Sequence, residues 1–105
     1  MNDDDEAVDR ERRQLLLMLD RLRRFEAGSL FIAKMISDLE GLLEALEITP
    51  DPWRDEFREQ WGELEIPYAV SLDRLEPIPD ATDPQIRTAV ERMLDLVQGR
   101  LLELG

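Results

Sequence analysis

The sequence predicts an all-α protein, folded as an antiparallel four-helix bundle with a proline-kinked third helix. Apolar residues recur at i, i+3 and i+4 spacing along most of the 105 residues, and no window keeps a strand-like alternation for more than a few residues. Glycine and proline clusters divide the chain into four helical segments with short connections, which favours a simple bundle. We expect one domain over residues 1–105, with residues 1–6 as a frayed tail.

The first helix is expected from Asp5 to Glu26. Gly28 suits the left-handed residue that closes a helix, and the Ser29 hydroxyl can cap the helix that follows. The apolar residues of this segment share one helical face; they are Leu15, Met18, Leu19, Leu22 and Phe25.

The second helix is expected from Leu30 to Glu47. On one of its faces Ser37, Gly41 and Ala45 recur every four residues as a strip of small side chains, which lets another backbone approach closely. Close packing there would offset the roughly 1 kcal/mol that a glycine costs inside a helix. The strip predicts a helix that is contacted on two sides. The opposite, apolar face consists of Ile32, Ile36, Leu39, Leu43 and Leu46.

The segment "ITPDPW" starts a third helix, because Thr49 or Asp51 can cap it and proline is tolerated in a first turn. An internal proline removes one backbone hydrogen bond and clashes with the preceding turn, so we expect a kink between Gly62 and Pro67. Two short helices separated at Ile66 are the alternative. The apolar stripe keeps its helical phase throughout and is interpreted as core; it consists of Trp53, Phe57, Trp61, Leu64, Tyr68, Leu72 and Leu75.

A loop is expected from Glu76 to Pro84, where three prolines and several turn-forming residues gather. The fourth helix follows it. Its cap is either Thr82 with Gln85 as a capping box, or Asp83 with proline at the first helical position. Its apolar residues are Ile86, Val90, Met93, Leu94, Val97, Leu101 and Leu104.

The composition argues against several classes of function. A net charge of −12 repels phosphate backbones and anionic lipid, so we expect neither nucleic acid nor a membrane as partner. Without cysteine or histidine the chain lacks thiolates, the usual general base and the commonest metal ligand. We therefore expect no enzyme activity, no catalytic residues, no metal and no cofactor. The acidic N-terminal segment "MNDDDEAVDRERR" does not resemble a secretory signal, and we expect a cytoplasmic protein.

Two arginine-rich segments, "DRERR" and "DRLRR", lie eleven residues apart. Eleven residues are about three helical turns, so the corresponding arginines form a basic stripe between Arg10 and Arg24. We favour pairing with the protein's own acidic residues. A phosphate or nucleic-acid contact is the alternative, but no aromatic or glycine-rich loop accompanies the stripe to support it.

The excess negative charge is concentrated in the middle of the chain, with fourteen carboxylates against three arginines between Asp38 and Asp83. Like charges at i, i+4 spacing destabilise a helix by about 0.2–0.5 kcal/mol per pair. Complementarity to a basic protein partner would explain such a surface, and solubility alone is the competing explanation. The residues predicted to bind a partner are Asp38, Glu44, Asp55, Glu56, Glu59, Glu63 and Ile66.

Several segments carry a resemblance to a known group of proteins: "FEAGSL", "SDLEGLLEAL", the pair Trp53 and Phe57, "WGELE" and "YAVSLD". Together, over about residues 22–75, they resemble small acidic all-helical bacterial immunity proteins of contact-dependent and other polymorphic toxin systems. The resemblance implies a protein that binds a cognate toxin domain, often a nuclease, and blocks it. The dipeptide Ile66-Pro67 and the arginine-rich N-terminus depart from the pattern of that family.

These observations predict a non-catalytic protein-binding module, an immunity or inhibitor protein whose acidic helical surface covers a basic toxin domain. A second hypothesis is a helical assembly or scaffolding subunit that forms a homodimer or binds another helical protein. In that case the strip formed by Ser37, Gly41 and Ala45 would belong to the interface.

Overall fold

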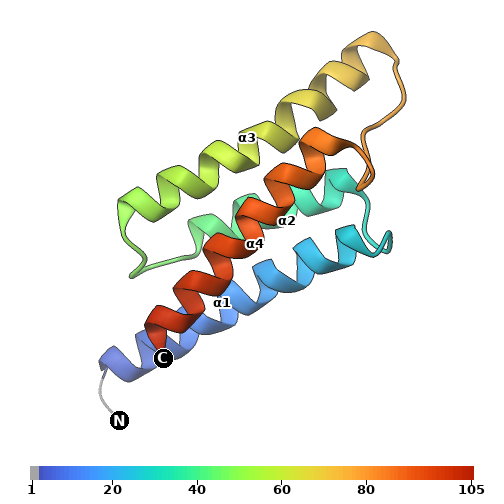
Figure 1. The fold of residues 1–105 in the computed structure, drawn as a ribbon. Coiled ribbons are helices and arrows are strands. Elements are labelled where there is room, and N and C mark those ends of the chain that lie inside the picture. The colour runs from blue at the N-terminus through green and yellow to red at the C-terminus, as the bar shows by residue number, and fades with distance from the viewer. Residues whose placement is uncertain (1–2) are drawn as a thin grey trace.

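A computed structural model describes residues 3–105, and within that range the chain forms four helices and no strand. The helices are α1 (Asp3–Glu26), α2 (Ile32–Glu44), α3 (Asp51–Arg74) and α4 (Pro84–Leu104), as Figure 1 shows. The predicted all-α class and the four helices are therefore confirmed. Residues 3–6, which we expected in a frayed tail, belong to α1. The remainder of that segment lies outside the described residues.

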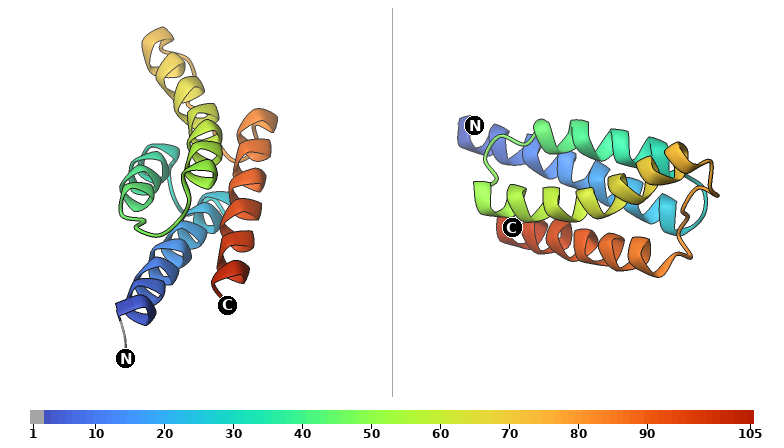
Figure 2. Two further views of the ribbon diagram at one scale, coloured as in Figure 1. Left: turned by 90° about the vertical axis from the view of Figure 1, so that its left-hand side faces the viewer. Right: turned by 90° about the horizontal axis from the view of Figure 1, so that it is seen from above.

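The helices pack as a ring in which α1 and α3 each contact both α2 and α4 (Figure 2). The N-terminal half of α1 lies beside the ends of α2 and α4. There, Glu11 accepts a hydrogen bond of 2.8 Å from the backbone N–H of Glu47, and Arg12 donates one of 2.7 Å to the carbonyl oxygen of Gly105. The molecule is 52 Å long, so its two ends are separate surfaces.

The core runs along the centre of this ring and is built from the predicted apolar faces. Every apolar position predicted for the second helix is buried, and Met35 joins them. On α1 and α4 the central positions are buried, whereas Leu19, Leu94 and Leu101 are half-buried against them. Burial of these side chains is the main term that holds the helices together. The buried core residues outside α2 are Leu15, Met18, Leu22, Phe25, Leu46, Phe57, Leu64, Ile86, Ala89, Val90, Met93 and Val97.

Aromatic residues connect α3 to both of its neighbours. Phe57 is fully buried and stacks on Trp53, with ring centroids 5.2 Å apart and ring planes 11° from parallel. The indole N–H of Trp53 donates to the carbonyl oxygen of Leu96 in α4 at 3.0 Å, and that of Trp61 donates to the carbonyl oxygen of Ile36 in α2 at 2.9 Å. The interpretation of these aromatic residues as core is confirmed.

Helix α3 continues through Pro67 as one element, so the alternative of two short helices is wrong. The kink between Gly62 and Pro67 stays a prediction. The apolar stripe, however, ends earlier than expected, because Leu72 is half exposed and Leu75 is 93% exposed. The last turns of α3 extend beyond the other helices (Figures 1 and 2), so the bundle does not cover these two side chains fully.

Helix α2 is shorter than the predicted range from Leu30 to Glu47. Ser29 does not cap it; its hydroxyl donates to the carbonyl oxygen of Arg24 at 3.1 Å. Phe31 occupies the N-cap position and makes no side-chain cap. The helix ends at Glu44 because the following residues form a loop whose N–H groups bind α1.

The predicted cap of α3 is wrong, and one of the two predicted caps of α4 is confirmed. Neither Thr49 nor Asp51 caps α3, whose N-cap is Pro50 without a side-chain hydrogen bond, because the Thr49 hydroxyl donates to Glu11. At α4 the predicted Asp83 cap is confirmed, with its carboxylate accepting from the N–H of Gln85 at 3.0 Å. The alternative capping box is wrong, since the Thr82 side chain binds Asp80.

The strip of small residues on α2 does not face another helix. Ser37, Gly41 and Ala45 are all exposed, and a Cβ atom built on Gly41 would meet no atom within 4 Å outside the backbone of its own helix. The prediction that this strip packs within the bundle is wrong. Helix α2 contacts α1 and α3 through the sides of its apolar face instead.

Replacing Leu75 by glycine is expected to raise the free energy of unfolding by about 1 kcal/mol. Leu75 closes α3 in the left-handed region, at φ 53° and ψ 38°, where a Cβ atom is strained and glycine is not. Urea denaturation measures the change. Leu75→Ala is the matched control, because it removes the exposed side chain and keeps the strain. Equal stability of the two variants would contradict this explanation.

Candidate functional site

The outer side of α3 carries three exposed carboxylates within two turns, at Asp55, Glu56 and Glu59. None of them has a hydrogen-bond or ion-pair partner among the described residues. Ile66, two turns further along the helix, is 61% exposed. We call these four residues the α3 acidic face. The face combines three unpaired carboxylates with one exposed apolar side chain.

Neither Arg54 nor Arg58 of α3 forms an ion pair with the carboxylates of this face. The guanidinium of Arg54 turns to the connection between α2 and α3, where it donates to the carbonyl oxygens of Thr49, at 2.9 Å, and Leu46. Arg58 is exposed and forms no ion pair with another described residue. The negative charge of the face is therefore directed to solvent.

Asp38 lies on α2, within an ion-pair network of its own. Its carboxylate accepts from Lys34 at 2.7 Å and from Arg21 of α1 at 2.9 Å. The hydrogen bond from Lys34, reinforced by that from Arg21, lowers the pKa of Asp38 against the opposing effect of desolvation. The same contact with Asp38 raises the pKa of Arg21. The structure thus places Asp38 in a pairing of α1 with α2, apart from the α3 acidic face.

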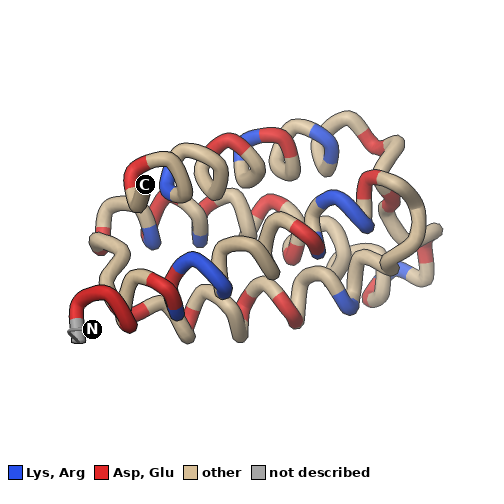
Figure 3. The backbone as a smooth tube through the Cα atoms, turned by 90° about the horizontal axis from the view of Figure 1, so that it is seen from below, with Lys and Arg blue, Asp and Glu red and all other residues tan. Residues whose placement is uncertain are grey.

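The other two predicted residues, Glu44 and Glu63, do not belong to the α3 acidic face. Glu63 accepts a hydrogen bond of 3.1 Å from the Gln85 side chain of α4. Glu44 is the last residue of α2 and is exposed. The predicted set therefore divides into a shared surface on α3, one residue at the border with α4 and two on α2. Figure 3 shows how the charged residues are distributed along the backbone.

Four of the six arginines in the α1 stripe pair with the protein's own carboxylates, as we favoured from the sequence. Arg10 lies 3.3 Å from Glu47 in the loop after α2, and Arg24 lies 3.2 Å from Asp20 one turn earlier. Arg13 and Arg23 are exposed and have no partner among the described residues, so the stripe is paired only in part.

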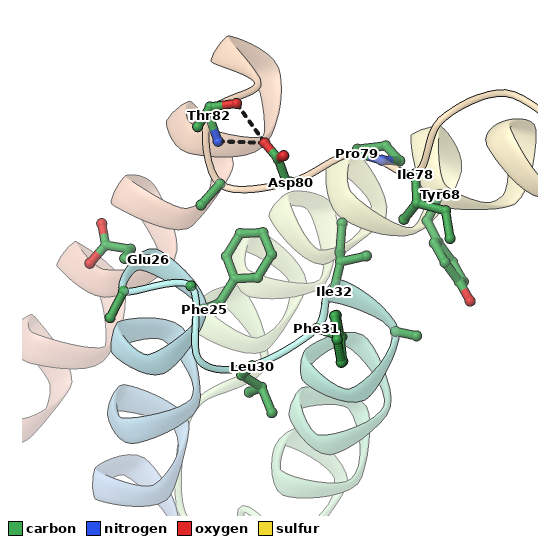
Figure 4. Close-up of a pocket in the computed structure, with 14 residues that line it drawn as sticks. Phe25, Glu26, Leu30, Phe31, Ile32, Tyr68, Ile78, Pro79, Asp80 and Thr82 are labelled. Carbon is green, nitrogen blue, oxygen red and sulfur yellow. Dashed lines mark hydrogen bonds between the residues drawn. The ribbon is translucent and has the colours of Figure 1, made fainter.

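A cavity of about 770 Å³ opens at the other end of the molecule, and the sequence did not reveal it (Figure 4). Phe25 and Phe31 line it from the two sides of the connection between α1 and α2, Tyr68 lines it from α3, and Ile78 lines it from the loop before α4. Only the folded chain brings these segments together. The signal in the sequence was a bulky apolar residue, Phe31, where a helix start favours a polar cap.

Two carboxylates, Glu26 and Asp80, are the only charged side chains among the described residues that line this cavity. Asp80 accepts from the hydroxyl of Thr82 at 2.6 Å and from its backbone N–H at 2.9 Å, and these two hydrogen bonds lower the pKa of Asp80. Glu26 is exposed and has no partner among the described residues. The cavity is therefore apolar with an acidic rim.

A buried carboxylate, Glu11, organises the opposite end of the bundle. It is 1% exposed and accepts hydrogen bonds from the N–H groups of Glu47 (2.8 Å) and Ile48 (3.0 Å) and from the Thr49 hydroxyl (2.5 Å). Burial raises the pKa of Glu11, but the hydrogen bonds, above all that from Thr49, together bring it below its ordinary value. Arg100 donates to the same threonine hydroxyl at 3.3 Å. This cluster fixes the loop between α2 and α3.

Within residues 3–105 no group of three or more carboxylates lies close enough together to hold a metal ion. None of the helices in that range combines the length and the apolar composition that a membrane crossing requires. Comparison of the chain with protein-family models, with curated proteins and with solved structures gives no match. The resemblance to immunity proteins therefore stays a prediction from the sequence.

Proposed function

We propose that this protein is a non-catalytic protein-binding module of the immunity type, which neutralises a basic toxin domain, with nucleases as the leading class, in the cytoplasm. One observation supports this proposal above the others. Asp55, Glu56 and Glu59 present negative charge within two turns of α3, and none of them forms an ion pair with a cation of the described chain. Nucleases need cationic clefts to hold phosphate, so an acidic helix face is complementary to them.

The proposed mechanism is occlusion. The carboxylates speed the encounter with the cationic cleft and fix its orientation, while Ile66 supplies apolar contact area at one end of the face. The proposal includes the antiparallel order of the helices and a bend of α3 near Pro67, which together would turn this face outward. Glu63 extends the negative field toward α4.

Reversing two charges of the face, with Asp55→Lys and Glu59→Lys in one variant, is expected to weaken binding of the basic partner about 100-fold. The partner is recovered from the native cell with the tagged protein, and its affinity is then measured by titration calorimetry. The matched control is Glu40→Lys with Glu91→Lys, which makes the same charge change at two exposed carboxylates of α2 and α4 that have no partner among the described residues. Equal weakening by the two variants would show a general charge effect and would contradict a specific face.

Self-association is the second candidate, and it is favoured by the exposed strip of Ser37, Gly41 and Ala45. Two copies could approach closely along such a strip. Sedimentation of the purified protein separates the candidates. A dimer that Gly41→Leu dissociates, and that reversal of Asp55 and Glu59 leaves intact, would favour the assembly function over the inhibitor.

A further inference from the structure

The stability of the fold does not explain why a phenylalanine occupies position 31. Its side chain is 87% exposed although phenylalanine is among the most apolar residues. It also occupies the N-cap of α2 in an extended conformation, at φ −71° and ψ 149°, and no side-chain hydrogen bond caps the helix. Serine, aspartate or asparagine would stabilise α2 at this position, and phenylalanine cannot. No contact within the described chain accounts for either observation.

The size of the cavity beside Phe31 and its apolar rim indicate what kind of partner could bind there. Its volume of about 770 Å³ is within the range of protein sites that enclose a bulky apolar group. Ile78, on the loop across the opening, is 53% exposed, so the apolar surface continues from the cavity on to its rim. A small molecule inside the cavity would leave the apolar rim exposed to water. A protein segment is large enough to fill the cavity and to cover the rim as well.

Charge identifies the kind of segment. The charged residues of the lining, Glu26 and Asp80, are both acidic. Arg87 does not line the cavity; it lines an adjoining depression that shares Glu26 with the cavity. A complementary occupant therefore carries lysine or arginine next to its apolar side chains. Apolar and basic residues on opposite sides of one segment are the pattern of a basic amphipathic helix, which docks into grooves through apolar anchors.

We propose that this cavity docks a basic amphipathic helix of a partner protein. A bulky apolar side chain of the helix fills the space between Phe31, Tyr68 and Ile78, and a neighbouring cation lies beside Glu26. The site is distinct from the α3 acidic face, because Tyr68 and Ile66 are two residues apart on one helix and so point to nearly opposite sides of it. The inference goes beyond the proposed function and does not require it.

The probe is a synthetic helical peptide of about 18 residues with leucine and one tryptophan on one face and lysine on the other. Its affinity is measured by titration calorimetry at about 150 mM salt, where charges beyond about 8 Å are screened. Two protein variants test the cavity. Phe31→Ser removes the exposed anchor and supplies a helix cap, and Ala33→Trp fills the cavity from an exposed position on α2. Each is expected to weaken binding at least about tenfold.

The matched control is the variant with Asp55→Lys and Glu59→Lys, which is expected to change the affinity less than about threefold. A peptide of the same composition with its leucines spread around the helix is expected not to bind. Thermal unfolding checks the variants, and Phe31→Ser should not lower the melting temperature because its cap stabilises α2.

Three results would overturn the proposal. The first is absence of peptide binding to the unmodified protein. The second is an affinity that both cavity variants leave unchanged, or that only the reversal of Asp55 and Glu59 abolishes, which would place the peptide on the α3 acidic face. The third is a dimer that Phe31→Ser dissociates, since a second copy would then cover the cavity. Failure of the proposed function alone would leave peptide binding to the cavity intact.

Discussion

Replacing Phe57 by alanine is expected to lower the free energy of unfolding by about 4 kcal/mol. Phe57 is fully buried in α3 and stacks on Trp53, whose indole group is hydrogen-bonded to α4. Truncation removes the apolar contacts of the ring and leaves a cavity that the surrounding helices cannot fill completely. It also releases Trp53 from its stacking partner. Urea denaturation followed by tryptophan fluorescence and by circular dichroism measures the loss.

Phe31→Ala is the control for this prediction, because it makes the same chemical change at an 87% exposed position. Its effect is expected to stay within about 0.5 kcal/mol, as for surface substitutions in general. Comparable losses for the two variants would contradict the arrangement in which Phe57 is core and Phe31 is surface.

Glu11→Gln is expected to lower the free energy of unfolding by about 2–3 kcal/mol at neutral pH. One carboxylate oxygen of Glu11 accepts from the N–H of Glu47, and the other accepts from the N–H of Ile48 and the hydroxyl of Thr49. An amide has a single acceptor oxygen, and its NH₂ group would face a donor in either orientation. At least one buried donor is then left without a partner. The matched control is Glu40→Gln, an exposed carboxylate of α2 with no partner among the described residues.

The effect of Glu11→Gln should depend on pH in a defined direction. Because the folded state lowers the pKa of Glu11 below its ordinary 4.5, the carboxylate stabilises the fold fully above that pH. This stabilisation is lost as the pH falls through the lower pKa of the folded state. The difference in unfolding free energy between the unmodified protein and Glu11→Gln should therefore be constant from pH 7 to about 5 and decrease below about 4.5. A difference that does not change down to pH 3 would contradict the assignment.

Helical periodicity in the sequence was sufficient to predict which residues form the core of the bundle. The residues Ile36, Leu39 and Leu43 recur at helical spacing, and all are buried as expected. The same reasoning placed Phe57 inside and Asp55 outside. Such predictions succeed because the side-chain direction on a helix depends only on the position along the chain. The cap at Asp83 was predictable for the same reason, since the side chain and the N–H group it binds are neighbours in sequence.

Other features could not be predicted, because they depend on which segments of the chain pack against one another. Leu75 continues the apolar stripe of α3 but has nothing to cover it, because the helix extends beyond its neighbours. Glu11 shares the spacing of the buried residues of α1, yet it could be recognised as a structural carboxylate only when the loop at Ile48 was placed beside it. The cavity next to Phe31 is formed by segments between Phe25 and Thr82, which lie 57 residues apart in the sequence. A periodic pattern specifies the face of a helix and not the length or position of the partner that covers it, so these contacts were decided by the packing of the whole chain.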